Sequence, residues 1–437
     1  MSEMQAARKK VLHTIDGMKD EIVQCCSDLV KIPSVDPLYP GIVQKDFLGG
    51  EKRCNEFLKS IMEEFGCETD MFEKEPYRTN LVGLLRGEGK GRSLILNGHI
   101  DTVPWGRSED WMWNDPVSGK VFDGKIYGRG SCDMKSGIVA MIKAIEAIKK
   151  CGYDLKGDVI LESVVGEEME SHHLGTSATV KKGYRADAAI VTEPSAPPIS
   201  LAIVPVTSGF LYMTLDVIGK AVHCSMRREL VRAGGKGSQV GVNAVEKGVK
   251  MLLALQELET QWGISKTHPL FRPGHFTIHP GVVIGGPHGV LVPFIISEFC
   301  TIHYAVWYPP DETYESVTRE IEDYVRSAAQ LDPWLRDHPP KVEWKLHWPP
   351  SKTEVDDPIC KTLASAHENA TGLPAQYQGF CATCDATFLN EQGIPTVIYG
   401  PGDLSVAHGP NEYVPVDELI DATRTYALTA LDWCGVK

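Results

Sequence analysis

Histidine and carboxylate side chains follow four apolar segments of this sequence, and together they have the chemistry of a metal site. Glu167 and Glu168 come directly after the apolar run at 159–166. The other candidate ligands, each beside an apolar segment, are His99 with its neighbour Asp101, and Asp133, Glu193 and His408. Imidazole nitrogen and carboxylate oxygen suit Zn²⁺, Mn²⁺ or Co²⁺, and thiolates are not required. Adjacent buried carboxylates are costly unless positive charge neutralises them, which also favours bound cations.

Two ions bridged by one carboxylate would form a hydrolytic centre. Asp133 is the expected bridge because it lies between the strand sites, and such a centre can provide hydroxide at neutral pH. Glu167, beside the candidate ligand Glu168, is placed to take the water proton as general base. Side chains alternate along an extended backbone, so these two glutamates are not expected to bind the same ion. Asp101 is expected to accept the second ring N–H of His99 and so to fix its tautomer.

Each of these residues also has an ordinary structural explanation. A single His-x-Asp is often a turn, and adjacent glutamates often begin a solvated helix. Asp133 could cap the helix that follows it, and His408 could belong to a polar turn. Their joint occurrence after apolar strands favours the metal site. Competing motifs are incomplete, since Gly128-Arg129-Gly130 lacks the third glycine of a dinucleotide loop and no nucleophile elbow stands between a strand and a helix.

The elements expected around these residues place them at one edge of a sheet. Short apolar strands alternate with helical patterns over residues 80–200, which is typical of a parallel sheet covered by helices. The expected elements are strands at 93–97, 159–165 and 188–191 and a helix at 136–149. Sites in open α/β sheets form at the carboxyl ends of the strands. The candidate ligands are therefore expected to converge on one cleft.

The pattern changes near Pro205, where a second domain is expected to begin. Its expected strands are 210–218, 274–284, 297–308 and 341–348, and its helices are 243–262 and 314–330. This β-α-β-β-α-β order is typical of a ferredoxin-like unit. We therefore predict an α/β fold in which residues 1–205 and 351–437 form a doubly wound, mixed-sheet catalytic domain. An α+β domain at 206–350 is inserted into it.

Composition excludes some partners. The chain has 437 residues and a net charge of −14, without a basic stretch that would bind nucleic acid. Its polar start lacks a signal-peptide core, and no stretch approaches the roughly 18 apolar residues of a membrane span. The twelve cysteines are scattered, and Cys381 and Cys384 form a C-x-x-C without a second pair. We expect reduced thiols, a cytoplasmic location, and no membrane or nucleic-acid partner.

The motifs around these residues resemble the metallohydrolase family of acetylornithine deacetylase, succinyl-diaminopimelate desuccinylase, aminoacylase and glutamate carboxypeptidase. They span most of the chain and are Asn97-Gly-His99-Ile-Asp101-Thr-Val-Pro104, Tyr127-Gly-Arg-Gly-Ser-Cys-Asp133-Met-Lys-Ser-Gly137, Glu167-Glu168, Val191-Thr-Glu193-Pro194 and His408-Gly-Pro-Asn-Glu412. The resemblance implies one ion held by His99, Asp133 and Glu193. It implies a second ion held by Asp133, Glu168 and His408. Glu167 is then the base and Asp101 the partner of His99.

The resemblance also implies a homodimer formed through the inserted domain. The stretch Gly219-Lys-Ala-Val-His223-Cys-Ser225 matches a motif of the family's inserted domain. By resemblance, His223 reaches the cleft of the neighbouring subunit and stabilises the developing oxyanion. The alternative is an ordinary surface histidine.

Two departures from the family pattern concern the substrate. Val290-Leu291-Val292-Pro293 lacks the usual asparagine, and Trp307 stands about where an arginine that clamps a substrate carboxylate is expected. An indole cannot bind a carboxylate in the bidentate manner of arginine. His288 is a candidate replacement contact. Cys384 stands before Asp385, which also departs from the pattern.

These observations predict a homodimeric hydrolase that uses one or two divalent ions (Zn²⁺, or Mn²⁺ or Co²⁺) per subunit. Its expected reaction is cleavage of a C–N bond in a small-molecule substrate, most simply the amide of an N-acyl amino acid or small dipeptide. One alternative is hydrolytic removal of an amino group from an aromatic amine, with Trp307, Tyr308 and Phe294 lining a stacking pocket. A second alternative is a binding protein without catalysis.

Overall fold

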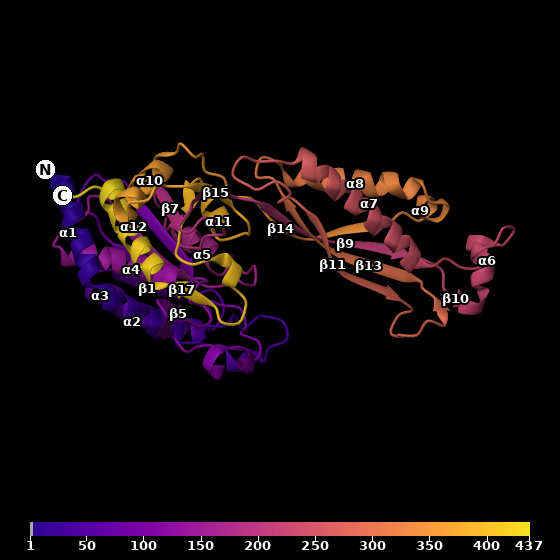
Figure 1. Cartoon of the computed structure of the whole chain (residues 1–437), viewed down its shortest axis with the longest axis horizontal. Coiled ribbons are helices and arrows are strands. Elements are labelled where there is room, and N and C mark those ends of the chain that lie inside the picture. The colour runs from indigo at the N-terminus through magenta and orange to yellow at the C-terminus, as the bar shows by residue number, and fades with distance from the viewer. Residues whose placement is uncertain (1–2) are drawn as a thin grey trace. The chain divides into compact units, whose positions relative to one another are not determined.

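The computed structural model describes residues 3–437, which form two compact units (Figure 1). The first unit comprises the chain up to Thr207 together with Ser351–Lys437, and the second is Ser208–Pro350. The sequence predicts 1–205 with 351–437 for the first unit and 206–350 for the second. The second unit is thus an insertion between two parts of the first.

The first unit is built on an eight-stranded sheet with the strand order β1-β2-β6-β3-β7-β16-β8-β15. These strands are β1 (Glu68–Glu73), β2 (Thr79–Leu85), β3 (Leu94–His99), β6 (Val159–Val164), β7 (Ala188–Val191), β8 (Ile203–Thr207), β15 (Tyr377–Phe380) and β16 (Thr396–Ile398). A small sheet consists of β4 (Lys120–Phe122), β5 (Lys125–Tyr127) and β17 (Tyr413–Pro415). The helices are α1 (Glu3–Gly17), α2 (Lys19–Val30), α3 (Gly50–Glu64), α4 (Lys135–Lys150), α5 (Thr176–Lys182), α10 (Pro358–Thr371), α11 (Ala386–Asn390) and α12 (Val416–Cys434).

Each face of the large sheet has its own apolar core. Along β3, Leu94 and Leu96 contribute to one core and Ile95 to the other, because side chains alternate along a strand. Helices α4 and α12 lie in the larger core, and α5 and α11 contribute to the smaller one. Helices therefore cover both faces, and the sheet is mixed because β1, β2 and β8 make antiparallel pairs. The predicted doubly wound α/β architecture is confirmed.

The central strands of this sheet end at the same edge. β3 lies between β6 and β7 and is parallel to both, and β16 runs parallel to β7. Residues that follow these four strands are therefore close in space although they are far apart in the chain.

The second unit has a four-stranded antiparallel sheet in the order β11-β13-β9-β14. Its strands are β9 (Gly209–Ile218), β10 (Val222–His223), β11 (Ile278–Gly286), β12 (Ile295–Ile296), β13 (Phe299–Tyr308) and β14 (Lys341–Trp348). Its helices are α6 (Arg227–Val231), α7 (Ala244–Ser265), α8 (Tyr314–Gln330) and α9 (Pro333–Asp337). Helices α7 and α8 share an apolar core with one face of the sheet. This arrangement is the predicted ferredoxin-like one.

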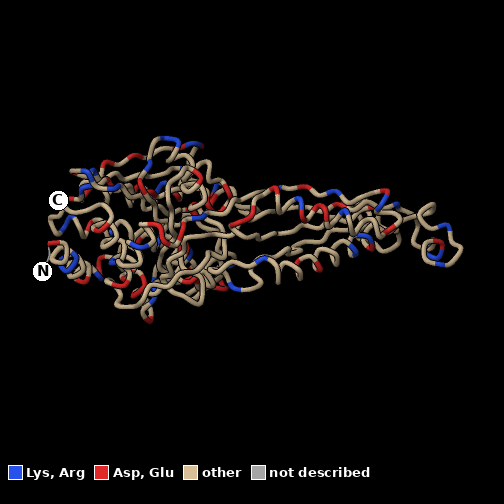
Figure 2. The backbone as a smooth tube through the Cα atoms, turned by 90° about the horizontal axis from the view of Figure 1, so that it is seen from above, with Lys and Arg blue, Asp and Glu red and all other residues tan. Residues whose placement is uncertain are grey.

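Charged residues of both signs are interspersed along both units (Figure 2). The chain has 58 acidic and 44 basic residues, so acidic side chains are in excess. Over residues 3–437, no helix has the length and apolar character needed to cross a membrane.

Glu162 is an ionisable group in the interior of the large sheet. It lies in β6 opposite Asn97 of β3, and the Asn97 amide donates to its Oε2 at 2.8 Å. Burial raises the pKa of Glu162 from 4.5 to about 7, although hydrogen bonds from Asn97 and Thr179 oppose the shift. The folded protein therefore retains a proton at this site over a pH range in which the unfolded chain has released it.

The substitution Glu162→Gln should make the free energy of unfolding less dependent on pH. The contribution of Glu162 to wild-type stability falls as the pH rises from about 4.5 to about 7, because over this range this site binds a proton in the native state but not in the unfolded chain. The glutamine keeps an acceptor for Asn97 but has no proton to lose. The variant should gain about 3 kcal/mol relative to wild type over this interval. Urea unfolding of metal-free protein at several pH values measures this gain, and a pH-independent difference would contradict it.

Candidate metal centre

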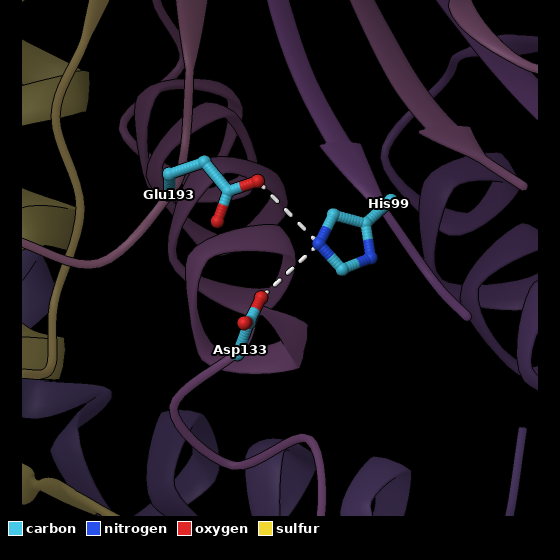
Figure 3. Close-up of side chains that lie close together, drawn as sticks. All are labelled: His99, Asp133 and Glu193. Atoms are coloured by element: carbon cyan, nitrogen blue, oxygen red, sulfur yellow. Dashed lines mark hydrogen bonds and ion pairs between the residues drawn. The ribbon is translucent and has the colours of Figure 1, made fainter. Parts of the chain in front are cut away.

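His99, Asp133 and Glu193 lie together although they come from three separate segments (Figure 3). His99 is the last residue of β3, Asp133 lies just before α4, and Glu193 lies just after β7. His99 Nε2 is 3.1 Å from Asp133 Oδ1 and 3.4 Å from Glu193 Oε1. All three side chains are buried. These residues are the first group of candidate ligands.

Two glycines allow these three segments to approach one another. A Cβ atom on Gly98 of β3 would lie 2.8 Å from Thr192 Oγ1. A Cβ atom on Gly137, in the first turn of α4, would lie 2.1 Å from the carbonyl oxygen of the same threonine. Both distances are too short for non-bonded atoms. Glycine at these positions therefore lets β3 and α4 pack against the residue that precedes Glu193.

Asp133, Glu168 and His408 form a second group. His408 Nε2 lies 3.3 Å from Asp133 Oδ2 and 3.1 Å from Glu168 Oε2. In each group the potential ligand atoms all lie within 4.8 Å of one another. Because one Asp133 oxygen faces His99 and the other faces His408, this carboxylate is shared by the two groups. The His408 side chain is 54% exposed, so the second group borders solvent.

The charges and donor atoms of the two groups fit divalent cations. Four carboxylates lie around two imidazoles, which leaves an excess of negative charge. Asp133 and Glu193 are buried, and Glu167 and Glu168 are partly buried. Burial raises the pKa of Glu193 to about 7 and that of Glu167 well above its usual value. Burial lowers the pKa of His408, but hydrogen bonds to Asp133 and Glu168 outweigh it and raise the value to about 11. Cations bound among these groups would replace the protons, and the nitrogen and oxygen donors suit Zn²⁺, Mn²⁺ or Co²⁺.

Glu167 lies beside the first group without belonging to either. Its Oε2 is 3.8 Å from His99 Nε2. Glu167 and Glu168 stand on a turn that follows Gly166, closed by a hydrogen bond from Glu170 N to Glu167 O at 3.0 Å. The predicted reason for their divergence, alternation along an extended strand, is therefore wrong. The turn itself directs one carboxylate toward His99 and the other toward His408.

The Asp101 carboxylate makes contacts other than the predicted one. His99 Nδ1 lies 2.9 Å from the backbone oxygen of Asp101 but 3.7 Å from its Oδ1. The carbonyl group is therefore the nearer acceptor for the ring N–H. The carboxylate instead accepts the backbone N–H groups of Gly166 at 2.9 Å and Glu168 at 3.1 Å. Asp101 thus fixes the turn that carries both glutamates.

A buried ionic network behind Asp101 was not predicted from the sequence. Arg78 donates to Asp36 at 2.7 Å and to Glu51 at 2.9 Å, and all three side chains are buried. Oxygen atoms of Asp36, Glu51 and Asp101 also lie within 4.8 Å of one another. The guanidinium group already supplies positive charge to these carboxylates. No spacing or motif joins these residues in the sequence, so only the fold reveals the network.

His223 lies on β10 in the second unit, with an exposed side chain. Its Nδ1 accepts the backbone N–H of Ser225 at 3.2 Å and lies 2.8 Å from the serine hydroxyl. A backbone N–H can only donate, so the neutral ring carries its proton on Nε2. His223 therefore presents an Nε2–H donor, as an oxyanion contact requires.

The aromatic residues predicted to form one pocket do not share a surface. Trp307 is partly buried and packs on Phe210, with ring centroids 4.7 Å apart. Its neighbour Tyr308 belongs to the apolar core beneath α7 and α8, and its hydroxyl group lies 2.8 Å from His347 Nε2. Phe294 is exposed. Because Trp307 and Tyr308 lie on opposite faces of β13, the prediction that they line one pocket is wrong.

The remaining residues noted in the sequence have ordinary surroundings. His288 stacks on Phe299, with ring centroids 3.9 Å apart. Cys381 is exposed, whereas Cys384 is buried, and burial raises the pKa of its thiol well above the usual value. Cys384 is therefore held as the neutral thiol.

This fold and this cluster of histidines and carboxylates define a metal-dependent hydrolase of amide C–N bonds. The chain belongs to the peptidase family M20/M25/M40, whose family model matches residues 95–432. It is 33% identical over 440 residues to N-formyl-4-amino-5-aminomethyl-2-methylpyrimidine deformylase of Halalkalibacterium halodurans, and the match covers 98% of each chain. It is 27% identical to acetylornithine deacetylase of Myxococcus xanthus, over 82% of this chain and 85% of that protein. The non-catalytic alternative is therefore wrong.

A solved structure supports the fold independently. The structure of an aminopeptidase from Bacillus cereus aligns with a TM-score of 0.70 and 19% identity, over 95% of this chain and 99% of that one. The chain therefore shares the fold of that aminopeptidase.

Asp133→Asn should reduce the divalent-metal content more than Glu193→Gln, because Asp133 contacts both histidines and Glu193 only one. We expect at least about tenfold weaker binding at both positions for Asp133→Asn and at one position for Glu193→Gln. Metal analysis after dialysis against Co²⁺ measures the content. Glu56→Gln, on the exposed surface of α3, is the control and should bind like wild type. Equal losses in the two variants would show that Asp133 is not shared.

Proposed function

We propose that this protein hydrolyses the N-formyl amide of a small heteroaromatic amine of the aminomethylpyrimidine type, releasing formate and the free amine. The observation that carries this proposal is the 33% identity to a deformylase of such a compound over 98% of both chains. Trp307 gives further support, because it occupies the position expected for a carboxylate-binding arginine. A formylaminomethylpyrimidine has no carboxylate and therefore does not need that arginine.

The runner-up is hydrolysis of an N-acyl amino acid or small dipeptide. Its support is the 27% identity to acetylornithine deacetylase. Such a substrate presents a carboxylate, and an indole at position 307 cannot bind it in a bidentate manner. Deamination of an arylamine was supported only by the predicted aromatic pocket. Because Trp307 and Tyr308 lie on opposite faces of β13, they do not form that pocket and the support is removed.

The proposed ion ligands are the two groups that share Asp133. The first position is held by His99, Asp133 and Glu193, and the second by Asp133, Glu168 and His408. Occupation of both positions, by Zn²⁺ or by Mn²⁺ or Co²⁺, belongs to this proposal. Divalent ions polarise a carbonyl oxygen and make water a stronger nucleophile at neutral pH.

Glu167 is the proposed general base. It accepts a proton from the water that attacks the formyl carbon and delivers the proton to the amine nitrogen as the C–N bond breaks. Its carboxylate is close to His99 but outside both ligand groups, so it is free for proton transfer. Asp101 supports this role because it holds the turn on which Glu167 stands.

We also propose a homodimer formed through the second unit. β11 is an edge strand, and Val282, Val283 and Ile284 on it are each about half exposed. An apolar edge strand of this kind favours pairing with another strand. In the dimer, His223 of the partner subunit would donate its Nε2–H to the oxyanion of the substrate. A cytoplasmic location also remains a prediction, supported by twelve scattered cysteines.

A substrate panel tests the proposed activity. Protein loaded separately with Zn²⁺, Mn²⁺ or Co²⁺ is assayed with N-formyl-4-amino-5-aminomethyl-2-methylpyrimidine, N-acetylornithine and a dipeptide. We expect kcat/KM for the formyl compound to exceed the others by at least about 100-fold, because the carboxylates of the other substrates would lack the arginine that pairs with them. A preference for N-acetylornithine or the dipeptide would overturn the proposal.

Glu167→Gln should lower kcat by about 10²- to 10⁴-fold, because the amide cannot accept the water proton. Its metal content should equal that of wild type, since Glu167 belongs to neither ligand group. Glu170→Gln, on the same turn, controls for disturbance of the turn. Substantial activity of Glu167→Gln would exclude the base assignment.

Subunit mixing tests the role of His223. Glu167→Gln and His223→Ala homodimers should each be nearly inactive. A heterodimer of the two has one complete site, because the intact histidine of one subunit serves the intact glutamate of the other. Equimolar refolding should therefore restore about a quarter of the wild-type activity. No recovery, with heterodimers demonstrated by differential tagging, would refute a contribution across the interface.

A further inference from the structure

A buried ion pair, Arg129 with Glu412, lies behind the second group of candidate ligands. The side chains are 3% and 0% exposed, and they are directly hydrogen-bonded. Arg129 follows β5, and Glu412 directly precedes β17. Neither belongs to the two groups that share Asp133. The pair therefore needs an explanation other than direct metal binding.

Glu412 holds the backbone beside the shared ligand. Its Oε1 accepts the N–H groups of Cys132 at 2.9 Å and Asp133 at 3.1 Å. Two hydrogen bonds to successive amides fix the peptide plane as well as its position. The Glu412 carboxylate thereby fixes the position of the Asp133 backbone from which the ligand side chain extends.

Arg129 holds the backbone at His408, another ligand of the second group. Its Nη2 donates to the carbonyl oxygens of His408 at 3.0 Å and Gly409 at 3.3 Å. A longer contact of 3.4 Å reaches the carbonyl oxygen of Pro104. The φ angle of His408 is 60°, a left-handed conformation that residues with a Cβ atom rarely adopt. The guanidinium thus stabilises an unfavourable backbone conformation at a candidate ligand.

The surroundings of the guanidinium favour a positioning role over a contribution to stability. A buried ion pair often contributes little net stability, because removing both charges from water is costly. The Nε of Arg129 has no hydrogen-bond partner among the described residues, and the guanidinium carbon lies 5.2 Å from the centre of the Trp111 ring. The pair is buried, despite the cost of removing its charges from water, at a place where it contacts the backbones of both Asp133 and His408.

We propose that the Arg129–Glu412 pair is a positioning device for the second ion, because it fixes the backbones of Asp133 and His408 relative to each other. The pair holds two of the three ligands of the second position, Asp133 and His408, but only Asp133 of the first. The other two ligands of the first position, His99 and Glu193, are held by β3 and by the segment after β7, so this position depends on the pair less. This inference rests on the proposed ligand groups and is independent of the substrate.

Titration of the metal-free protein with Co²⁺ tests the proposal. Isothermal calorimetry is applied to wild type, Arg129→Lys and Glu412→Gln. Arg129→Lys retains the charge but loses the planar fork that reaches several carbonyls, and Glu412→Gln loses the charge. In both variants the Kd of the second ion should rise about 10- to 100-fold, while that of the first changes less than about threefold.

Lys143→Gln is the matched control for loss of a buried charge. Lys143 lies in α4 of the same unit, is 4% exposed, and pairs with Glu21 at 2.6 Å and Glu146 at 2.7 Å. Its substitution should lower Tm without changing either Co²⁺ affinity. If Arg129→Lys does not fold, as judged by circular dichroism, Glu412→Gln alone carries the test.

The outcomes are distinct. Selective weakening of the second ion supports the proposal. Unchanged affinities, or equal losses at both positions, would overturn it and leave the pair a purely structural role. Wild-type protein that binds fewer than two Co²⁺ ions would overturn it as well, together with the ligand groups. Failure of the substrate proposal would leave these affinities unaffected, because the titration contains no substrate.

Discussion

Carboxylates buried at the carboxyl edge of the large sheet must be compensated by positive charge. Arg78 compensates Asp36 and Glu51, and Arg129 compensates Glu412. The candidate ligand groups have two imidazoles for four carboxylates, so the proposed divalent cations would complete the balance. Guanidinium groups and the proposed ions would thus compensate negative charge at adjacent places. The arginines hold the surrounding backbone, and the proposed ions take part in the chemistry.

Much of the fold, and the meeting of the candidate ligands at one edge, follows from local patterns, whereas the division of these ligands into two groups is implied by the family resemblance. The apolar runs at β3, β6 and β7 predicted parallel strands, and parallel strands end at one edge, which is why residues following them meet. The Arg78 network could not be predicted in this way. Asp36 lies in a loop, Glu51 in α3 and Arg78 directly before β2, and no regular spacing in the sequence connects them. The contacts of Asp101 depend on the turn after Gly166. Gly166 has a φ of 87°, and the pattern of apolar residues in the sequence does not predict this conformation.

The aromatic pocket illustrates a different kind of error. Adjacent side chains on a strand point to opposite faces, and β13 follows this rule throughout, with partly buried and buried residues in strict alternation. Trp307 and Tyr308 are both aromatic, but their adjacent positions on the strand place them on opposite faces. The same alternation leaves Trp307 on the face away from α7 and α8, while the proposed metal chemistry belongs entirely to the first unit. The ligand groups and the proposed base thus lie in the first unit, whereas Trp307 and the proposed oxyanion contact, His223, lie in the second.

The inserted unit leaves and re-enters the first unit at neighbouring residues. Thr207 N donates to the carbonyl oxygen of Ser351 at 3.0 Å, and Ser351 N donates to Thr207 Oγ1 at 2.8 Å. For the catalytic sheet, the whole insertion is therefore equivalent to a loop whose two ends are already joined. Closing such a loop costs only slightly more entropy as its length increases. Changes in the length of the inserted unit therefore leave the sheet and its ligand groups in place, while the pairing of subunits and the proposed contact of His223 change with the insertion.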